Sequence, residues 1–364
     1  MPNLLLCMTP GVGLNTWKKN GTLNRELKPY IEYVRRGWNV KILTYDKEGI
    51  PVLPSGISVV RFPNHWHWFI WFLPWTHNYI GKWADVIKTN QSVHSYFYVF
   101  AARIWKKPIL LRCGYVRGEY LETVKGHTVK TKIYQFMESF AFKLANFCQV
   151  PTKELSGWVQ KRYRVSNIKI NIVPNFVDID LFKPIKGIQK KEKSVISVGR
   201  LEPVKRFDLL IKSCSQISGC NLTIIGEGSD RSKLEQLAEE LKVNVNLPGN
   251  VPNEKLPEIL NQHQVFAITS KREGHPKTLI EAMACGLACI CFDVIGVNNI
   301  INNGCNGLLI EPDSSKMKAA IIKLFQDDSL CNKLSQSARM YIKNKYSFLK
   351  CFGIEYKIIT GMIQ

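Results

Sequence analysis

The chain has 364 residues, with 50 Lys and Arg against 29 Asp and Glu, and therefore a formal net charge of +21. Hydrophobic residues make up 45% and charged residues 22%, which is typical of a globular protein and excludes an intrinsically disordered one. At roughly 100–200 residues per domain, this length predicts two domains. The 11 cysteines have no regular spacing and form no metal-binding pattern with histidines, which favours a reduced, cytoplasmic protein.

Positive charge and tryptophan are concentrated in the first half of the chain. Residues 1–184 hold 26 Lys and Arg against 11 Asp and Glu, a net charge of +15, whereas residues 185–364 reach only +6. All nine tryptophans lie at or before Trp158. We recognise no basic leader with a signal segment and no apolar stretch of the roughly 18 residues that span a bilayer, so we expect neither a secreted nor an integral membrane protein.

Short apolar runs alternate with helical patterns from the N-terminus onward. In the first half we predict a loop over Gly11–Gly21, between a first strand and a helix that stops at Gly37. The predicted strands are Leu4–Met8, Val40–Thr44, Val59–Phe62, Val86–Thr89 and Ile109–Arg112, and the predicted helices are Leu23–Arg35 and Lys130–Ala145.

The second half shows the same alternation with shorter connections. This pattern favours a parallel sheet covered by helices on both faces. The basic segment Lys183–Lys193, which contains Pro184 and Gly187, has the composition of a linker. The predicted strands are Ser194–Val198, Asn221–Ile225, Asn244–Leu247, Val265–Thr269, Ala288–Phe292 and Gly307–Ile310, and the predicted helices are Arg206–Ser215, Ser229–Leu241, Leu256–Asn261, Pro276–Cys285 and Ser314–Gln326.

Two carboxylates eight residues apart form the densest group of candidate functional residues. Glu273 precedes a predicted helix and Glu281 lies inside it. At the carboxyl edge of a parallel sheet both would lie near a helix N-terminus, where the N–H groups of residues 277–279 can bind phosphate oxygens. Carboxylates also accept several hydroxyl donors at once, as a sugar requires. Upstream, Arg200 and Lys205 follow another strand and offer two cations to a diphosphate.

These residues stand in motifs that resemble glycosyltransferase family 4. The resemblance is specific over about Ile172–Pro312 and loose over the first half of the chain. It is carried by Gly199-Arg200-Leu201 with Lys205 and Asp208, by the Glu273-to-Glu281 block ending at Gly286, by Asn175-Phe-Val-Asp178 with Phe182, and by Gly226-Glu-Gly228 with Leu234.

The resemblance implies an α/β protein with the GT-B fold, in which two Rossmann-like domains with parallel sheets face each other across a cleft. It implies an acceptor-binding domain over residues 1–174 and an interdomain motif and linker over residues 175–193. A nucleotide-sugar donor domain would follow over residues 194–345, and a C-terminal helix at about 346–364 would pack back on the first domain.

The resemblance also implies roles for individual residues. Arg200 and Lys205 would bind the donor diphosphate and stabilise the charge that develops on the departing nucleoside diphosphate. Glu281 would hold the ribose hydroxyls, and Glu273 those of the transferred sugar, so Arg200, Lys205 and Glu273 are the catalytic candidates. The remaining candidate contacts to the donor and its phosphates are Gly199, Gly274, Lys277, Thr278, Leu279, Gly11 and Gly13.

The sequence departs from the family pattern on the acceptor side. The family commonly has a histidine after a strand of the first domain, whereas here the stretch after Ile109 reads Leu-Leu-Arg112-Cys-Gly-Tyr115. Either Arg112 or Tyr115 takes a related position, or His94, which follows another strand, does. The usual Glu of a late donor loop is Asn299.

Several of these motifs have a simpler interpretation. Gly11 and Gly13 lack the third glycine of a dinucleotide fingerprint, so a plain strand-to-helix turn is an equal alternative to a phosphate contact. Asp178-Ile-Asp180 matches a metal-binding pattern but lies inside the interdomain motif, and we predict no essential metal and no cofactor. His275, between the two carboxylates, either contacts the donor sugar or is a spacer.

The segment His65–Trp75 carries four tryptophans. Such a segment either packs inside the first domain or lies at a membrane interface, where tryptophan is favoured and lysines attract anionic lipid. Because the +15 half of the chain carries it, we expect the first domain to contact the cytoplasmic face of a membrane peripherally.

The sequence therefore predicts a retaining, metal-independent glycosyltransferase. It would move a sugar from a UDP- or GDP-linked donor to a saccharide or lipid-linked acceptor. A nucleotide-sugar epimerase or a phosphorylase on the same fold is the first alternative. A non-catalytic basic protein that binds membrane or nucleic acid is the second, but no nucleic-acid-binding module is recognisable and we expect no nucleic-acid partner.

Overall fold

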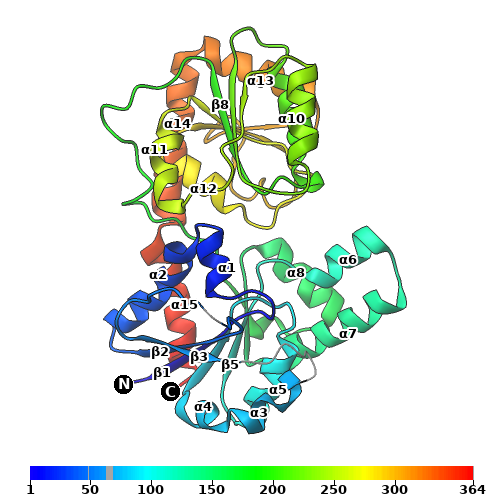
Figure 1. Cartoon of the computed structure of the whole chain (residues 1–364), viewed down its shortest axis with the longest axis vertical. Helices are drawn as coiled ribbons and strands as arrows, with labels where there is room; N and C mark the ends of the chain where they lie inside the picture. The colour runs from blue at the N-terminus through cyan, green and yellow to red at the C-terminus, as the bar shows by residue number, and fades with distance from the viewer. Residues whose placement is uncertain (48, 63–68, 364) are drawn as a thin grey trace. The chain divides into compact units, whose positions relative to one another are not determined.

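The computed structural model describes residues 1–47, 49–62 and 69–363, which form two compact units (Figure 1). Unit 1 comprises Met1–Pro174 together with the chain from Phe352 onward, and unit 2 comprises Asn175–Cys351. Each unit is built on one sheet whose strands are all parallel and whose connections contain helices. The α/β class with two parallel sheets is thereby confirmed.

The sheet of unit 1 has seven strands in the order β3-β2-β1-β4-β5-β6-β7. Its central strands are almost entirely buried because both faces are covered. All four residues of the strand Val86–Thr89 are buried, the polar Lys88 and Thr89 included. The strands are β1 (Asn3–Cys7), β2 (Asn39–Thr44), β3 (Ile57–Arg61), β4 (Val86–Thr89), β5 (Ile109–Arg112), β6 (Phe147–Val150) and β7 (Ile170–Ile172).

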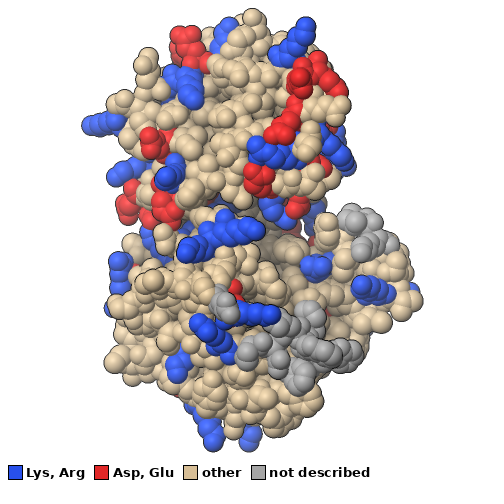
Figure 2. Space-filling view, in the orientation of Figure 1, with Lys and Arg blue, Asp and Glu red and all other residues tan. Residues whose placement is uncertain are grey.

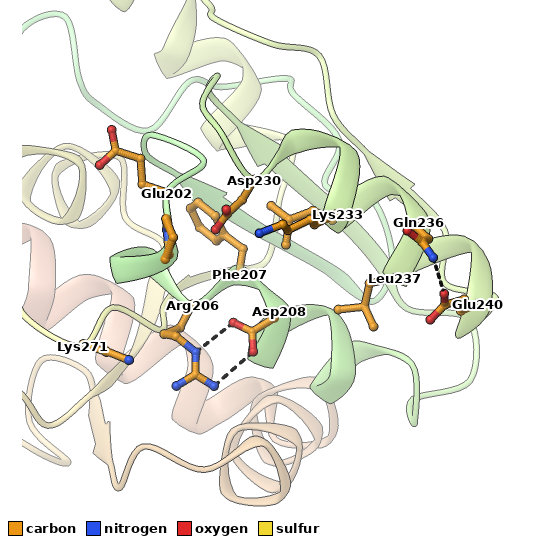
Figure 3. Close-up of a pocket in the computed structure, with 12 residues that line it drawn as sticks. Glu202, Arg206, Phe207, Asp208, Asp230, Lys233, Gln236, Leu237, Glu240 and Lys271 are labelled. Atoms are coloured by element: carbon orange, nitrogen blue, oxygen red, sulfur yellow. Dashed lines mark hydrogen bonds and ion pairs between the residues drawn. The ribbon is translucent and has the colours of Figure 1, made fainter.

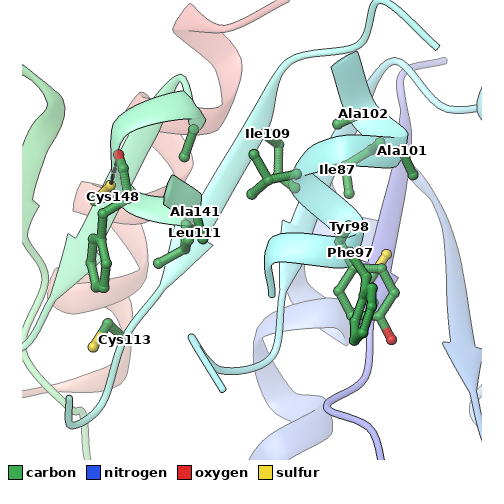
Figure 4. Close-up of a cluster of buried hydrophobic side chains, with 14 of the residues drawn as sticks. Ile87, Phe97, Tyr98, Ala101, Ala102, Ile109, Leu111, Cys113, Ala141 and Cys148 are labelled. Atoms are coloured by element: carbon green, nitrogen blue, oxygen red, sulfur yellow. Dashed lines mark hydrogen bonds between the residues drawn. The ribbon is translucent and has the colours of Figure 1, made fainter. Parts of the chain in front are cut away.

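Helices pack on this sheet and build its core. Phe97 and Ala101, from the helix Tyr96–Ile104, lie in one buried cluster with Ile87 and Ile109 of the sheet (Figure 4). The helical segments of unit 1 are α1 (Leu14–Lys19), α2 (Leu23–Arg35), η1 (Phe69–Phe72), α3 (Leu73–Thr76), α4 (Asn78–Trp83), α5 (Tyr96–Ile104), α6 (Arg117–Lys125), α7 (Val129–Leu144), α8 (Lys153–Tyr163) and η2 (Asn167–Lys169).

The loop predicted over Gly11–Gly21 was wrong, because α1 occupies its centre. Leu14 and Trp17, one helical turn apart, are both buried. The Asp46 carboxylate accepts the backbone N–H groups of Leu14 at 2.6 Å and Asn15 at 3.3 Å. A helix of six residues is too short to persist without such support, and here the cap comes from a residue far along the chain.

Unit 2 has a sheet of six strands in the order β10-β9-β8-β11-β12-β13. Every strand and helix predicted for this part of the chain is present, with ends that shift by at most two residues. The strands are β8 (Ser194–Val198), β9 (Asn221–Ile225), β10 (Val245–Asn246), β11 (Val265–Ile268), β12 (Ala288–Phe292) and β13 (Leu308–Ile310); the helical segments are η3 (Pro203–Lys205), α9 (Phe207–Cys214), α10 (Arg231–Glu240), η4 (Asn253–Lys255), α11 (Leu256–Asn261), α12 (Lys277–Ala284), α13 (Ser314–Gln326) and α14 (Asp328–Lys345).

A last helix, α15 (Phe348–Gly361), begins in unit 2 and continues into unit 1. Its Glu355 side chain forms an ion pair with Lys88 of β4, with 2.5 Å between Nζ and Oε1. The C-terminal helix therefore packs on the first sheet. None of the helices in the described part of the chain combines the length and the apolar character that a bilayer span requires.

Candidate active site

The strand order of unit 2 places two loops beside each other at the centre of the sheet. The chain runs from β8 outward through β9 and β10, then returns to add β11 on the other side of β8. Ligands of open parallel sheets bind outside the carboxyl ends of the strands at such a reversal. The loop after β8 carries Gly199–Lys205, and the loop after β11 carries Ser270–Glu273. The candidate donor residues therefore lie where the topology favours a ligand.

Lys205 and Glu273 are brought together by these two loops. The Lys205 Nζ lies 2.6 Å from Glu273 Oε1, which also accepts the Ser270 hydroxyl at 2.6 Å. Two bonds join the loops: the Thr269 hydroxyl donates to the Lys205 carbonyl, and the Lys271 N–H donates to the Val204 carbonyl. The side chains of Lys205 and Glu273 are only 21% and 11% exposed. Lys205 and Glu273 are therefore in direct contact although 68 residues separate them in sequence.

The backbone at Glu273 is held by the loop after β12. The Glu273 N–H donates to the Ile295 carbonyl at 3.1 Å. Gly296, at φ +90°, packs directly on the Glu273 and Gly274 carbonyls, where a Cβ atom would lie 2.2 Å from the first oxygen. α12 then begins after Pro276, which has no side-chain group to cap the helix. The first N–H groups of α12, over Lys277, Thr278 and Leu279, thus belong to a helix N-terminus beside Glu273.

Glu281 and Arg200 occupy contrasting environments. Glu281, in α12, is 2% exposed and accepts a hydrogen bond from the Asn253 side chain at 3.0 Å. The Arg200 side chain is 74% exposed and pairs with Glu202 at 2.6 Å. Gly199 is held next to β9, since its N–H donates to the Ile225 carbonyl. The structure therefore joins Lys205 with Glu273 but leaves Arg200 on the surface.

His275, which lies between Glu273 and Glu281 in sequence, is buried at 6% exposure. Its ring packs edge-on against Tyr346 with centroids 5.0 Å apart, and its carbonyl accepts the side-chain N–H of Asn175 at 2.7 Å. Neither ring nitrogen has a hydrogen-bond partner among the described residues. Burial lowers the pKa of the imidazole to about 4, so His275 is neutral at pH 7.

An open pocket of about 510 Å³ borders the loop that carries Lys205 (Figure 3). Its walls come from the start of α9 and from α10, and its lining is strongly charged. Arg206, at φ +51°, bonds both carboxylate oxygens of Asp208 at 2.9 and 3.1 Å at one side of it. Glu202 and Lys271 line the pocket, but the Lys205–Glu273 pair does not. The sequence did not predict this pocket.

In unit 1 the candidate acceptor residues follow two neighbouring strands, β4 and β5. The Arg112 guanidinium donates to the Asn90 carbonyl at 3.0 Å, and Gly114 N–H donates to the Gln91 side chain at 2.9 Å, which ties the two loops together. His94, at φ +57°, forms a 2.8 Å hydrogen bond between Nδ1 and the Tyr96 hydroxyl. Tyr115 is 46% exposed. All three predicted residues therefore lie at one edge of the sheet.

Gly11 and Gly13 precede α1 at the end of β1. Gly11 has φ +80° in open space, whereas a Cβ atom on Gly13 would lie 2.1 Å from the Asp46 carboxylate. The Gly13 N–H donates to the Thr16 hydroxyl and the Val12 N–H to the Thr9 carbonyl. The first amides of α1 bind the Asp46 carboxylate, the position that a phosphate would otherwise take at a helix N-terminus.

No cluster of His, Cys, Asp or Glu side chains suited to a metal ion occurs among the described residues. Comparison with known proteins identifies the chain more directly. Residues 178–341 match the family described as "Glycosyl transferases group 1", and residues 31–181 match "Glycosyltransferase Family 4".

The chain is a GT-B glycosyltransferase. It is 28% identical over 291 residues to UDP-Gal:alpha-D-GlcNAc-diphosphoundecaprenol alpha-1,3-galactosyltransferase of Escherichia coli, covering 73% of this chain and 72% of the relative. It is 30% identical over 220 residues, 58% of this chain and 59% of the relative, to the N-acetylgalactosamine-N,N'-diacetylbacillosaminyl-diphospho-undecaprenol 4-alpha-N-acetylgalactosaminyltransferase of Campylobacter jejuni. In fold it is similar to sucrose-phosphate synthase of Thermosynechococcus elongatus, with a TM-score of 0.81 at 17% identity over 100% of this chain and 99% of the other.

Sequence reasoning did not include some residues that shape the candidate site. Ser270 was not among the candidates, although its position three residues before Glu273 allows the turn contact that is observed. Asn253 was missed because it reaches Glu281 from a different segment, and no local pattern marks it.

The buried His275 should make the stability of the glycosyltransferase depend on pH. Its folded pKa of about 4 lies below the ordinary 6.5, so between pH 7 and pH 5 the unfolded chain binds a proton here that the folded chain excludes. The free energy of unfolding of the wild type should therefore fall by about 2 kcal/mol relative to a His275→Asn variant over that interval. Denaturant unfolding of both proteins at the two pH values measures this difference.

The exposed histidine His127 provides the matched control. A His127→Asn variant should keep the wild-type dependence of stability on pH. If the His275→Asn variant also keeps the wild-type dependence of stability on pH, the interpretation of His275 as a buried, neutral side chain is wrong.

Proposed function

We propose that this glycosyltransferase moves a hexose from a UDP-linked donor to a lipid-linked saccharide at the cytoplasmic face of a membrane, with retention of the anomeric configuration and without an essential metal. The observation that carries the proposal is the contact of Lys205 and Ser270 with Glu273, beside the N-terminus of α12 and at the reversal of strand order in unit 2. Both relatives named above act on diphospho-undecaprenol-linked sugars by their names, and the first uses UDP-Gal.

In this proposal, cations and helix N–H groups bind the donor diphosphate. Lys205 neutralises the phosphate that leaves with the nucleoside, and the first N–H groups of α12 bind its oxygens. Arg200, which pairs with Glu202 at the surface, turns to the second phosphate. The Lys205 ammonium is already fixed by Glu273, so little reorganisation is required when charge develops.

Carboxylates and His275 select the two sugars of the donor. Glu273 accepts hydroxyls of the transferred hexose and Glu281 accepts the ribose hydroxyls, since each carboxylate can accept more than one O–H donor. His275 follows Glu273 by two residues, and its two ring nitrogens are without partners among the described residues. Leaving a buried polar group unsatisfied costs about 1–3 kcal/mol, which a bond to a hexose hydroxyl would recover.

Retention follows if both partners use the same face of the anomeric carbon. The bond between that carbon and the diphosphate oxygen breaks, and the acceptor hydroxyl oxygen bonds to the carbon on the face that the diphosphate leaves. The hydroxyl proton passes to the departing phosphate oxygen, which Lys205 stabilises. This reaction needs no separate protein base. It therefore does not require a histidine at the acceptor-side position for which His94, Arg112 and Tyr115 are the candidates.

A donor and acceptor panel tests the proposal. UDP-, GDP- and ADP-linked hexoses are compared by thermal shift, and each stabilising donor is then incubated with a lipid-diphosphate-linked monosaccharide. We expect stabilisation by a UDP-sugar, a disaccharide product whose new linkage keeps the donor configuration by NMR, and unchanged rates after EDTA treatment. A new sugar nucleotide formed without acceptor would identify an epimerase instead, and an inverted linkage or a rate lost to EDTA would refute the corresponding part of the proposal.

A further inference from the structure

One helix of unit 1 carries an exposed apolar stripe. On α7, Val129, Ile133, Phe136 and Phe140 are 75%, 59%, 71% and 36% exposed. Their spacing of four, three and four residues places them within about 60° of one another on the helix. Large apolar side chains that gather on one surface mark an interaction site, whereas scattered ones do not. The α7 stripe, as we call these four residues, is therefore a candidate interaction surface.

The exposed charged residues of α7 are lysines that lie on both sides of the stripe. Lys130 flanks it on one side, and Lys132 and Lys143 flank it on the other, and all three are exposed. The single acid of the helix, Glu138, is 1% exposed on the opposite face. Figure 2 shows the same bias more widely, because the visible face of unit 1 carries several Lys and Arg side chains and very few Asp or Glu.

The buried face of α7 is fixed to the acceptor side of unit 1. The Glu138 carboxylate accepts the Gly118 N–H at 2.9 Å and the Tyr163 hydroxyl at 2.6 Å. Gly118 lies in the first turn of α6, a few residues after Arg112 at the end of β5 and Tyr115 in the loop that follows. The α7 stripe therefore lies about one helix diameter, roughly 10 Å, from the elements that support the candidate acceptor loop.

From this juxtaposition we infer that the α7 stripe docks the enzyme on an anionic lipid surface, so that the lipid-linked acceptor is presented to the β4 and β5 loops. An amphipathic helix with apolar residues at its centre and lysines on both sides fits the boundary between acyl chains and headgroups. A second copy of the chain fits less well, because stacking two such stripes would bring lysines against lysines. The inference deepens the proposed function and rests on it for the identity of the acceptor.

The surface differs from the aromatic segment that the sequence indicated. Residues 65–68 of the segment His65–Trp75 lie outside the described residues. Of the others, Trp71 packs edge-on against Phe97 with centroids 4.7 Å apart, and Trp75 is 61% exposed. Phe72 and Tyr79 are also exposed, at 55% and 59%, but this stretch is divided among η1, α3 and α4. The exposed apolar residues of α7 lie instead on one continuous helix of 16 residues.

Vesicle binding by the full chain tests the inference. The wild type should sediment with vesicles of about 30% phosphatidylglycerol in phosphatidylcholine and not with phosphatidylcholine alone. Ile133→Ser with Phe136→Ser should weaken this binding by about tenfold or more, and Lys130→Gln with Lys132→Gln by about tenfold. The matched controls are Met340→Ser with Leu349→Ser, which alter apolar side chains of unit 2 that are 61% and 65% exposed, and they should bind as the wild type does.

Separate readouts distinguish this inference from the proposed function. The α7 variants should keep the thermal stabilisation by a UDP-sugar and transfer to a short-chain, water-soluble acceptor, and should lose transfer to acceptor embedded in vesicles. If no UDP-sugar stabilises the wild type, the proposed function is refuted. The inference about α7 is then decided by the vesicle-binding experiment alone. Equal vesicle binding by wild type and both α7 variants would overturn the inference. A wild-type dimer that the Ile133→Ser, Phe136→Ser variant dissociates would overturn it in favour of a second copy.

Discussion

Replacing Lys205 by alanine should lower kcat for sugar transfer by about 10²–10³-fold. Of the two candidate cations, Lys205 is the more shielded one, 2.6 Å from Glu273 and only 21% exposed. Charge that develops on a leaving phosphate is stabilised most by a cation that is already oriented and shielded from water. Arg200, at 74% exposure, cannot substitute for it without first leaving Glu202. Steady-state kinetics with a UDP-sugar and a lipid-linked acceptor measures the loss.

Two controls separate this effect from a loss of folding. Lys323→Ala removes an exposed lysine of α13 and should keep the wild-type rate. The Lys205→Ala variant should also keep the circular dichroism spectrum of the wild type, since its loops remain joined by the Thr269 and Lys271 bonds. Wild-type kcat in Lys205→Ala would exclude this lysine from the reaction.

The strands of unit 2 could be predicted from sequence because each is a short apolar run bounded by polar or glycine residues. The residues 194–198, 221–225 and 288–292 were assigned with the observed ends. Unit 1 was harder, since only Ala145 and Asn146 separate β6 from α7, and a connection this short does not interrupt the apolar pattern. α1 was missed for a different reason: Asp46, which caps it, lies 32 residues from Leu14, and a local pattern cannot reveal such a contact.

The candidate site was likewise predicted only in part from the sequence. Motif order identified Lys205 and Glu273 as donor residues, but their mutual contact and that of Ser270 depend on β8 and β11 being neighbours. The α7 stripe was present in the sequence as part of a predicted helix. Its exposure became visible only once the opposite face, with Glu138, was seen to bind Gly118 and Tyr163.

Replacing Glu355 by glutamine should lower the free energy of unfolding of unit 1 by about 3–5 kcal/mol. The side chains of Lys88 and Glu355 are 3% and 8% exposed and lie 267 residues apart in sequence. Burial opposes ionisation of Glu355, but Lys88 and Arg112 outweigh it and lower the pKa of this carboxyl. Glutamine would leave the Lys88 ammonium buried without its counter-charge. Because every tryptophan lies at or before Trp158, tryptophan fluorescence during denaturant unfolding reports on unit 1 alone.

The reason for the loss can be tested with two further variants. Arg35→Gln removes the 74% exposed partner of a surface ion pair and should change the free energy of unfolding by less than about 1 kcal/mol. Lys88→Met combined with Glu355→Leu removes both charges and should recover most of the stability that Glu355→Gln loses, since desolvating the two ions offsets much of their attraction. A double variant as unstable as Glu355→Gln would mean that α15 depends on polar contacts of Glu355 that leucine cannot replace. One such contact is the hydrogen bond that the Tyr33 hydroxyl donates to Glu355 at 3.4 Å. A wild-type fluorescence transition in Glu355→Gln would mean that α15 does not pack on β4.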